Sequence, residues 1–288
     1  MTRRMLAIKK IVGIFFFVVF IFVFIISESS AAEHAETEHF LRRKATPPIA
    51  TLEEATKKKD LWYLEGYYEP DTLRLGSETG KLSEYIEKIG YISTNLHAYL
   101  WSTQMNKFGS DAELLNLGAY YNFKNSYIHY EVGFGWDDDY VYKFQNLCTL
   151  GVRVYKNLFF QTGYVFRDVQ PDNMHIVYPG IVYRFGDNLI NATYAASYTE
   201  SRGLANQGLV RGEFALMEFL KLSTGIAFGE RLFDASGLKA SLENGYSLFV
   251  VLDTAIFKHL NLKVGYTYGR ENPDFIRSGM NFALSTKF

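Results

Sequence analysis

The C-terminal stretch Phe275-Ile-Arg-Ser-Gly-Met-Asn-Phe-Ala-Leu-Ser-Thr-Lys-Phe288 alternates between two kinds of side chain. Every second residue, counted back from the end, gives one mostly apolar set: Phe288, Thr286, Leu284, Phe282, Met280, Ser278 and Ile276. The residues between them are small or polar: Lys287, Ser285, Ala283, Asn281, Gly279 and Arg277. Because successive side chains of a β-strand point to opposite faces, this period predicts a strand between two different solvents.

A terminal aromatic residue on such a strand resembles the C-terminal signal by which bacterial outer-membrane barrels are recognised for insertion. We therefore predict that Phe282, Leu284 and Phe288 form a membrane-insertion signal, and that the barrel-assembly machinery binds this strand.

The other end of the chain predicts export. Basic residues precede an apolar run at 11–26, and Ser29 and Ala31 follow at the −3 and −1 positions of a cleavage site, so residues 1–31 are typical of a Sec signal peptide. The alternative is an uncleaved inner-membrane anchor, but the run is shorter than the roughly 20 residues of a full span. Residues 32–60 are polar and lack clear periodicity, which predicts a flexible periplasmic tail.

Composition favours a membrane barrel. The chain has 24 Phe, 21 Tyr and 23 Gly, and after the signal no apolar run approaches the length of a spanning helix. The mature chain is then either soluble or a closed barrel, because lipid excludes unpaired backbone groups. Aromatic residues and glycine spread along alternating strands suit a lipid-facing wall around a polar lumen. The net charge of −1 gives no indication of nucleic-acid binding.

Short turns recur every thirty to forty residues or so, and longer polar connections lie between them, as an up-and-down barrel requires. From Leu61 we predict an all-β transmembrane up-and-down antiparallel β-barrel of about 14 strands, with 12 or 16 as alternatives, occupying residues 61–288. The predicted strands are 61–69, 85–94, 96–106, 112–123, 126–136, 143–155, 157–167, 175–185, 188–200, 207–217, 219–230, 244–256, 259–269 and 275–288. Pro179 cannot donate a ladder hydrogen bond and predicts a local bulge or bend.

Several aromatic–glycine motifs resemble the YaiO family of outer-membrane β-barrel proteins. They are the opening strand Trp62–Tyr68, the segment Tyr178–Phe185, the Gly265–Tyr268 strand and the terminal Phe288. The resemblance covers about residues 60–288 and implies an outer-membrane barrel, of a type often associated with surface polysaccharide or envelope genes. It implies no catalytic residues.

The alternation places a set of charged residues toward the lumen: Glu131, Arg153, Arg184, Arg211, Glu213, Lys221, Asp253, Lys263, Arg277 and Lys287. Most are basic, and a basic lumen attracts anions, which arginine binds through two parallel hydrogen bonds. The alternative is that these charges pair across the lumen and hold a narrow barrel shut.

Other candidates for chemistry are weak. Asp137, Asp138 and Asp139 predict a solvated rim loop, with a cation site or hydrolysis as alternatives. The strand histidines His97, His129 and His175 are best interpreted as lone polar residues lining the barrel, because no nucleophile is spaced beside an oriented base. Cys148 falls on the lipid face. We predict no enzyme activity and no cofactor.

These observations together predict a monomeric barrel among outer-membrane lipid and lipopolysaccharide. The expected role is a narrow channel or export-associated barrel for small polar or anionic solutes such as saccharides. The alternatives are a non-conducting scaffold that docks polysaccharide or envelope partners and, with least support, a hydrolase.

Overall fold

The structure is a computed structural model that describes residues 61–75, 78–107, 110–136, 141–169, 172–201, 203–232, 242–271 and 275–288. The predicted signal peptide, the predicted tail and the acidic segment Asp137–Asp139 lie outside the described residues. Over the described ranges, no helix has both the length and the apolar character needed to span a membrane.

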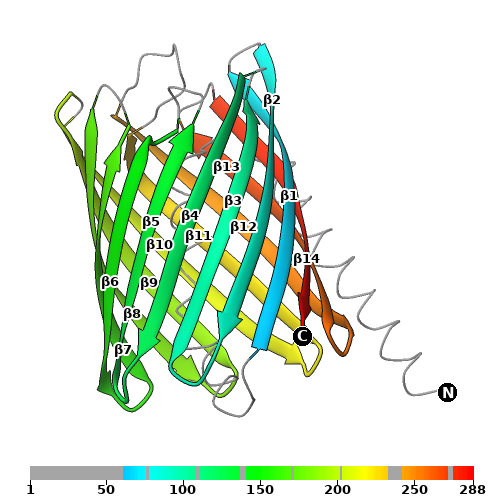
Figure 1. Cartoon of the computed structure of the whole chain (residues 1–288). Coiled ribbons are helices and arrows are strands. Elements are labelled where there is room, and N and C mark those ends of the chain that lie inside the picture. The colour runs from blue at the N-terminus through cyan, green and yellow to red at the C-terminus, as the bar shows by residue number, and fades with distance from the viewer. Residues whose placement is uncertain are drawn as a thin grey trace. The chain divides into compact units, whose positions relative to one another are not determined.

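Fourteen antiparallel strands form one closed barrel, in which each strand pairs with its neighbours in the sequence and the last strand pairs with the first (Figure 1). The predicted fold class and strand number are therefore confirmed. The strands are β1 (Leu61–Leu75), β2 (Glu78–Ile92), β3 (Leu96–Lys107), β4 (Ser110–Asn122), β5 (Ser126–Trp136), β6 (Phe144–Tyr155), β7 (Leu158–Asp168), β8 (Asn173–Phe185), β9 (Asn188–Thr199), β10 (Gly203–Met217), β11 (Leu220–Leu232), β12 (Leu242–Phe257), β13 (Leu260–Glu271) and β14 (Phe275–Lys287).

The barrel closes where β14 pairs with β1, in a register that runs from Tyr63 opposite Lys287 to Leu75 opposite Phe275. The backbone of the last residue takes part, because Phe288 N donates to Trp62 O and Trp62 N donates to Phe288 O, both at 3.0 Å. This seam removes the two free sheet edges, whose unpaired backbone groups would be unfavourable in lipid.

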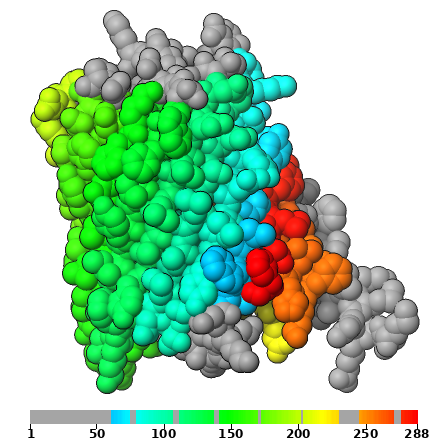
Figure 2. All heavy atoms as spheres, viewed as in Figure 1, coloured from blue at the N-terminus to red at the C-terminus, as the bar shows by residue number. Residues whose placement is uncertain are grey.

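Burial alternates along the strands and separates an inner from an outer face. On β5, Tyr127, His129 and Glu131 are buried, whereas Ile128 and Tyr130 between them are exposed. In a closed barrel the buried set faces the interior. The outer face carries large apolar side chains on nearly every strand, and Figure 2 views part of this wall from outside. A contiguous apolar outer surface of this kind is typical of a barrel embedded in lipid.

The first two strands are longer than predicted. β1 extends to Leu75 rather than residue 69, and β2 begins at Glu78 rather than residue 85. The extensions contain Pro70 and two carboxylates on the inner face, Asp71 and Glu84, so no apolar alternation marks them in the sequence. β10 is also longer than predicted, because it begins at Gly203 rather than at residue 207. Gly203 has a φ of +82° and follows the β9–β10 turn.

The predicted bulge at Pro179 is wrong. β8 continues through this residue, and its register with β9 is the same on both sides, with Val177 opposite Ala196 and Gly180 opposite Thr193. Only the pairs at Tyr178 and Pro179 are missing from the ladder, since proline has no N–H to donate. Register shifts occur instead in β6, β10 and β12, next to the tight turns.

Aromatic rings on the inner face lie over glycines on the neighbouring strand. The opposed pairs are Tyr63–Gly90, Tyr99–Gly118, Tyr127–Gly151, Tyr178–Gly163 and Phe249–Gly225. Glycine has no side chain, so the facing ring can lie against the backbone of the adjacent strand. These pairs give a packing role to four of the 21 Tyr and five of the 23 Gly in this chain.

We expect Gly151→Ala to destabilise the barrel. A β-carbon at Gly151 would stand 2.0 Å from the Tyr127 ring, which would have to leave its position. Overpacking of this kind lowers the free energy of unfolding by about 1–3 kcal/mol. Urea titration of the barrel in lipid vesicles measures the change.

The matched control is Gly66→Ala, because a β-carbon at Gly66 meets nothing within 4 Å. Its free energy of unfolding should stay within about 0.5 kcal/mol of the parent value. Equal losses in both variants would contradict the ring-over-glycine account.

Candidate functional site

The structure places the predicted charged residues on the inner face, where they differ in solvent exposure. Glu131, Arg211 and Arg277 are buried, at 1%, 8% and 1% exposure. Arg184, Glu213, Asp253 and Lys263 are partly buried, and Arg153 and Lys221 are exposed. Arg153, Arg184, Lys221 and Lys263 all lie within four residues of a strand end that adjoins a tight turn. These four cations therefore lie at the turn end of the barrel, as do the inner carboxylates Glu213 and Asp253.

Sequence analysis missed four inner carboxylates: Glu65, Glu69, Asp71 and Glu84. The first three alternate with outward residues along β1, and Glu84 lies on β2 with 2% exposure. Lys88 and Arg167 also face inward and were missed. The interior is consequently closer to charge balance than the predicted set implied.

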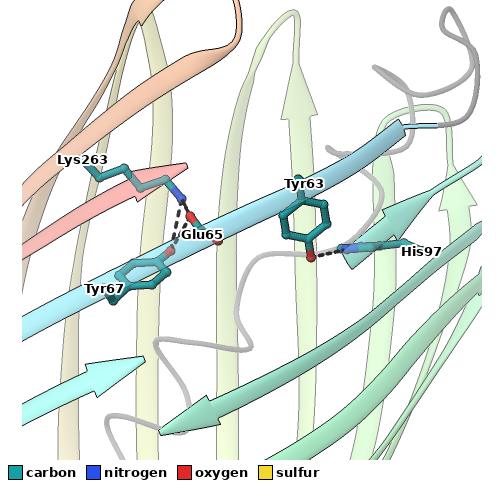
Figure 3. A network of polar contacts seen from close by, with 5 residues as sticks. All are labelled: Tyr63, Glu65, Tyr67, His97 and Lys263. Carbon is teal, nitrogen blue, oxygen red and sulfur yellow. Dashed lines mark hydrogen bonds and ion pairs between the residues drawn. The ribbon is translucent and has the colours of Figure 1, made fainter. Parts of the chain in front are cut away.

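Part of this charge spans the seam (Figure 3). The Lys263 ammonium on β13 reaches over β14 to bond Glu65 on β1, and it also donates to the Tyr67 hydroxyl at 3.1 Å. Tyr67 in turn donates to Glu65 at 2.9 Å. Ala283 lies between Lys263 and Tyr67 in the strand register, and its small side chain leaves room for the lysine to cross.

A second ionic contact lies further along the same seam. Arg277 on β14 bonds Asp71 on β1 through Nε and a terminal nitrogen, and its guanidinium lies 3.5 Å from Glu69. Arg277 and Asp71 have side-chain exposures of 1% and 0%. A side chain at Gly279 would collide with the Asp71 carboxylate, so glycine permits this approach.

Two further charge contacts follow the strands at the turn end. Lys263, Asp253 and Lys221 are directly opposed across β13, β12 and β11, so their charges alternate along one row of the inner face. On β10, Arg211 bonds Glu213 two residues away. Opposite charges on directly opposed residues, as at Lys263, Asp253 and Lys221, stabilise neighbouring strands.

A separate cluster of tyrosine and histidine lies on β1, β3, β4 and β5. The Tyr63 hydroxyl is 2.8 Å from His97 Nε2, and the Tyr99 hydroxyl is 2.7 Å from His129 Nε2. Tyr120 stacks on His129 with ring centroids 3.7 Å apart. Over the residues that the structure describes, no group of three or more His, Cys, Asp or Glu is placed to hold a metal ion.

The prediction for His175 is wrong. Its neighbours Met174 and Ile176 are buried on the inner face, which places His175 on the outer face near the start of β8. There its Nδ1 lies 2.7 Å from the hydroxyl of Tyr164. The alternation of β8 runs through Pro179 without a register shift, so His175 shares the outer face with the exposed Val177.

A chain of hydrogen bonds continues from Tyr99 toward the end of the barrel opposite the tight turns. Tyr99 donates to one oxygen of Glu131 at 2.6 Å, and Gln145 donates to the other at 3.0 Å. Arg167 Nε donates to Gln145 Oε1 at 2.8 Å. The Glu131 oxygens therefore accept one bond from β3, across β4, and one from the adjacent β6, which gives this carboxylate a structural role.

The residues of the predicted insertion signal lie on the outer face. Phe282, Leu284 and Phe288 have exposures of 39%, 50% and 65%. Cys148 alternates with the buried Leu147 and Thr149, which also places it on the outer face.

The barrel is similar to solved outer-membrane barrels. The monoaromatic hydrocarbon channel CymD matches with a TM-score of 0.62 and 8% identity, over 84% of this chain and 92% of that chain. A bacterial polysaccharide outer membrane secretin matches with a TM-score of 0.51 and 8% identity, over 80% of this chain and 98% of that chain. Neither a protein-family model nor a curated protein matches the sequence. At such identities the likeness shows the fold, that of an outer-membrane β-barrel.

We expect Arg277→Met to lower the free energy of unfolding by about 3–5 kcal/mol, because it leaves the Asp71 carboxylate buried without its cation. Urea titration in vesicles measures the loss. Lys258→Met, in the exposed β12–β13 turn, removes the same charge and should change stability by less than about 0.5 kcal/mol.

The double variant Asp71→Leu with Arg277→Met separates loss of the pair from loss of packing. It should recover part of the stability, since the buried Asp71 carboxylate is removed together with its cation and only Glu69, 13% exposed, loses its contact with Arg277. A double variant as unstable as Arg277→Met would show that the ionic contact is not the cause.

Proposed function

We propose that this protein is an outer-membrane channel for small polar or anionic solutes, with saccharides as the favoured class. The observation that carries the proposal is the group of cations on the inner face at the turn end, where Arg153, Arg184 and Lys221 lie, in addition to Lys263, which is bonded to Glu65. Cations around a pore mouth attract anions, and guanidinium groups bind carboxylate or phosphate in a fixed geometry.

The surroundings of two of these arginines suit an oxygen-rich solute. The guanidinium of Arg153 lies 5.0 Å from the centre of the Phe159 ring, and that of Arg184 lies 5.9 Å from it. Phe159 is 4% exposed, so the exposed guanidinium of Arg153 supplies the N–H donors at this position. The hydroxyl and carboxyl oxygens of saccharides match such donors.

The structural neighbours support passage across a membrane. One is described as a channel for monoaromatic hydrocarbons and the other as a polysaccharide secretin. The charged inner face of the present barrel favours polar solutes over hydrocarbons, because an apolar solute gains little from displacing water around charges.

The same proposal includes location and partners. We infer Sec export, a periplasmic tail, insertion by the barrel-assembly machinery through the β14 strand, and contact with lipopolysaccharide. We also infer a relationship to the YaiO family, which the aromatic–glycine motifs of the sequence support. A monomer is favoured, since every strand already has two partners within the barrel.

Planar-bilayer recording in a salt gradient tests the channel. We expect stable openings with anion preference, and we expect Lys221→Glu together with Arg153→Glu to shift the reversal potential toward cation preference. Lys258→Glu, in the β12–β13 turn, is the matched control and should leave the potential near the parent value.

Open channels whose reversal potential is unchanged by the two inner substitutions would contradict the proposed anion preference. A barrel that is correctly folded and yet never opens would contradict the channel itself and favour the docking scaffold.

A further inference from the structure

One carboxylate points outward from the middle of a strand, on the face that is otherwise suited to lipid. Glu87 on β2 is exposed and shares the outer face with Tyr85 and Ile89, which are 44% and 40% exposed. Other charged residues on the described outer face, such as Arg74, Lys81 and Glu113, lie within three residues of a strand end. Glu87 is five residues from the nearer end of β2.

The position of Glu87 along β2 places it at the level of the hydrocarbon. Tyr91 lies beside the tight turn and packs against Trp62 with ring centroids 5.1 Å apart, as in the aromatic girdle of a membrane barrel. Glu87 is four residues further along the strand, which corresponds to about 10 Å of depth once the strand tilt is included. The apolar band of such barrels is about 25 Å tall, so Glu87 lies near its centre.

A carboxylate in this place is unfavourable against lipid. The Tyr85 hydroxyl donates to Glu87 Oε1 at 3.1 Å, and no described residue donates to Oε2. Ionisable side chains at membrane depth almost always face protein or water, because hydrocarbon cannot solvate them. Another molecule that supplies hydrogen-bond donors is therefore needed to cover Glu87.

The neighbouring strand carries such donors at the same level. Ser102 on β3 is directly opposite Glu87, and Gln104 is directly opposite Tyr85. Both point outward, since Thr103 between them is 1% exposed on the inner face. A carboxylate acceptor on β2 thus lies beside a hydroxyl and an amide donor on β3, and these two strands are adjacent on the wall (Figure 1).

This arrangement is self-complementary. A twofold axis along the membrane normal, between β2 and β3, would bring β2 of one copy against β3 of the other at the same depth. The acceptor of each copy would then meet the donors of the other, and both copies would keep the same orientation in the membrane.

The wall beside Glu87 is low enough for close approach. Gly66 on β1 and Ser102 on β3 are its two directly opposed neighbours, and both are small. A β-carbon at Gly66 would meet nothing within 4 Å, so this space is open. Small residues at a contact within the membrane let two backbones come together.

We propose that two copies of this chain associate in the membrane through the outer faces of β2 and β3, with Glu87 of each copy bonded to Ser102 and Gln104 of the other. Strand pairing alone favours a monomer, because closure leaves no sheet edge for a second chain. The contact between walls is of another kind, so this dimer replaces that monomer. It concerns assembly and does not rest on the channel function.

Disulfide trapping between differently tagged chains tests the interface. In a Cys148→Ala background, chains with Glu87→Cys and chains with Ser102→Cys, reconstituted together in lipid vesicles, should form a linked dimer. The mixed dimer retains one of its two Glu87–Ser102 contacts. The matched control mixes Ile181→Cys with Ala192→Cys, which are directly opposed on the outer faces of β8 and β9 and should not crosslink.

Energy transfer between labelled copies, measured while the vesicle lipid is diluted, gives the strength of association. We expect Glu87→Leu to raise the dimer dissociation constant about tenfold or more, the effect of losing a hydrogen bond to a charged group. Glu87→Gln keeps an acceptor oxygen, so its effect should be smaller. Glu218→Leu, in the exposed β10–β11 turn, is the matched control and should leave the constant unchanged.

The outcomes separate a covered carboxylate from one that faces lipid. Crosslinking of the β2–β3 mixture alone, together with weaker association of Glu87→Leu, supports the dimer. Equal crosslinking in both mixtures overturns it. A Glu87→Leu protein that unfolds at higher urea concentration and shows unchanged energy transfer also overturns it, because that is the result of removing a charge from lipid. Bilayer currents decide separately whether the barrel conducts.

Discussion

The pairing of β14 with β1 is the contact on which the rest of this molecule depends. A sheet in lipid must satisfy every backbone N–H and C=O within itself, and only a closed ring of strands does so. Here closure reaches the last residue, since Phe288 and Trp62 exchange two backbone hydrogen bonds of 3.0 Å. The residue pairs between β1 and β14 join parts of the chain that are about as far apart in the sequence as the barrel allows. The hydrogen bonds of these pairs therefore offset the loss of chain entropy only when all strands are in place.

The seam also explains how the inner charges are distributed. Lys263 and Glu65 are 198 residues apart in the sequence, yet they are bonded because β13, β14 and β1 are consecutive around the ring. Arg277 and Asp71 form the second contact. A charge on one strand then stabilises the correct register of its neighbour, because a one-residue slip would turn it toward lipid. Arg153 and Lys221, at the turn end, lie on strands that do not form this seam. We propose that these cations attract anions.

Much of the fold was predictable because two solvents act on each strand. β13 alternates Leu260, Leu262 and Val264 with Asn261 and Lys263, and its bounds were predicted almost to the residue. The outer parts of β1 and β2 were missed because charged inner residues such as Asp71 and Glu84 replace the apolar alternation by which a strand is recognised.

The candidate site was predicted less well. Partners of Lys263 and Arg277 depend on ring closure, which no local pattern contains, and Glu87 lies on the face that was expected to be apolar. The available signal was the period of β2 itself, in which Glu87 shares one face with Tyr85 and Ile89.

Disulfide trapping across the seam tests the closed barrel most directly. Gly66 and Leu284 are paired residues of β1 and β14, and both lie on the outer face. Opposed antiparallel residues have Cα atoms about 4.5–5.5 Å apart, within the range of a disulfide. In a Cys148→Ala background, Gly66→Cys with Leu284→Cys should oxidise within one chain in lipid, whereas Gly66→Cys with Met280→Cys, four residues out of register, should not. The first crosslink links the two terminal fragments after cleavage of the loops. Crosslinks that form only between chains, or equally in both pairs, would contradict a barrel closed by its own first and last strands.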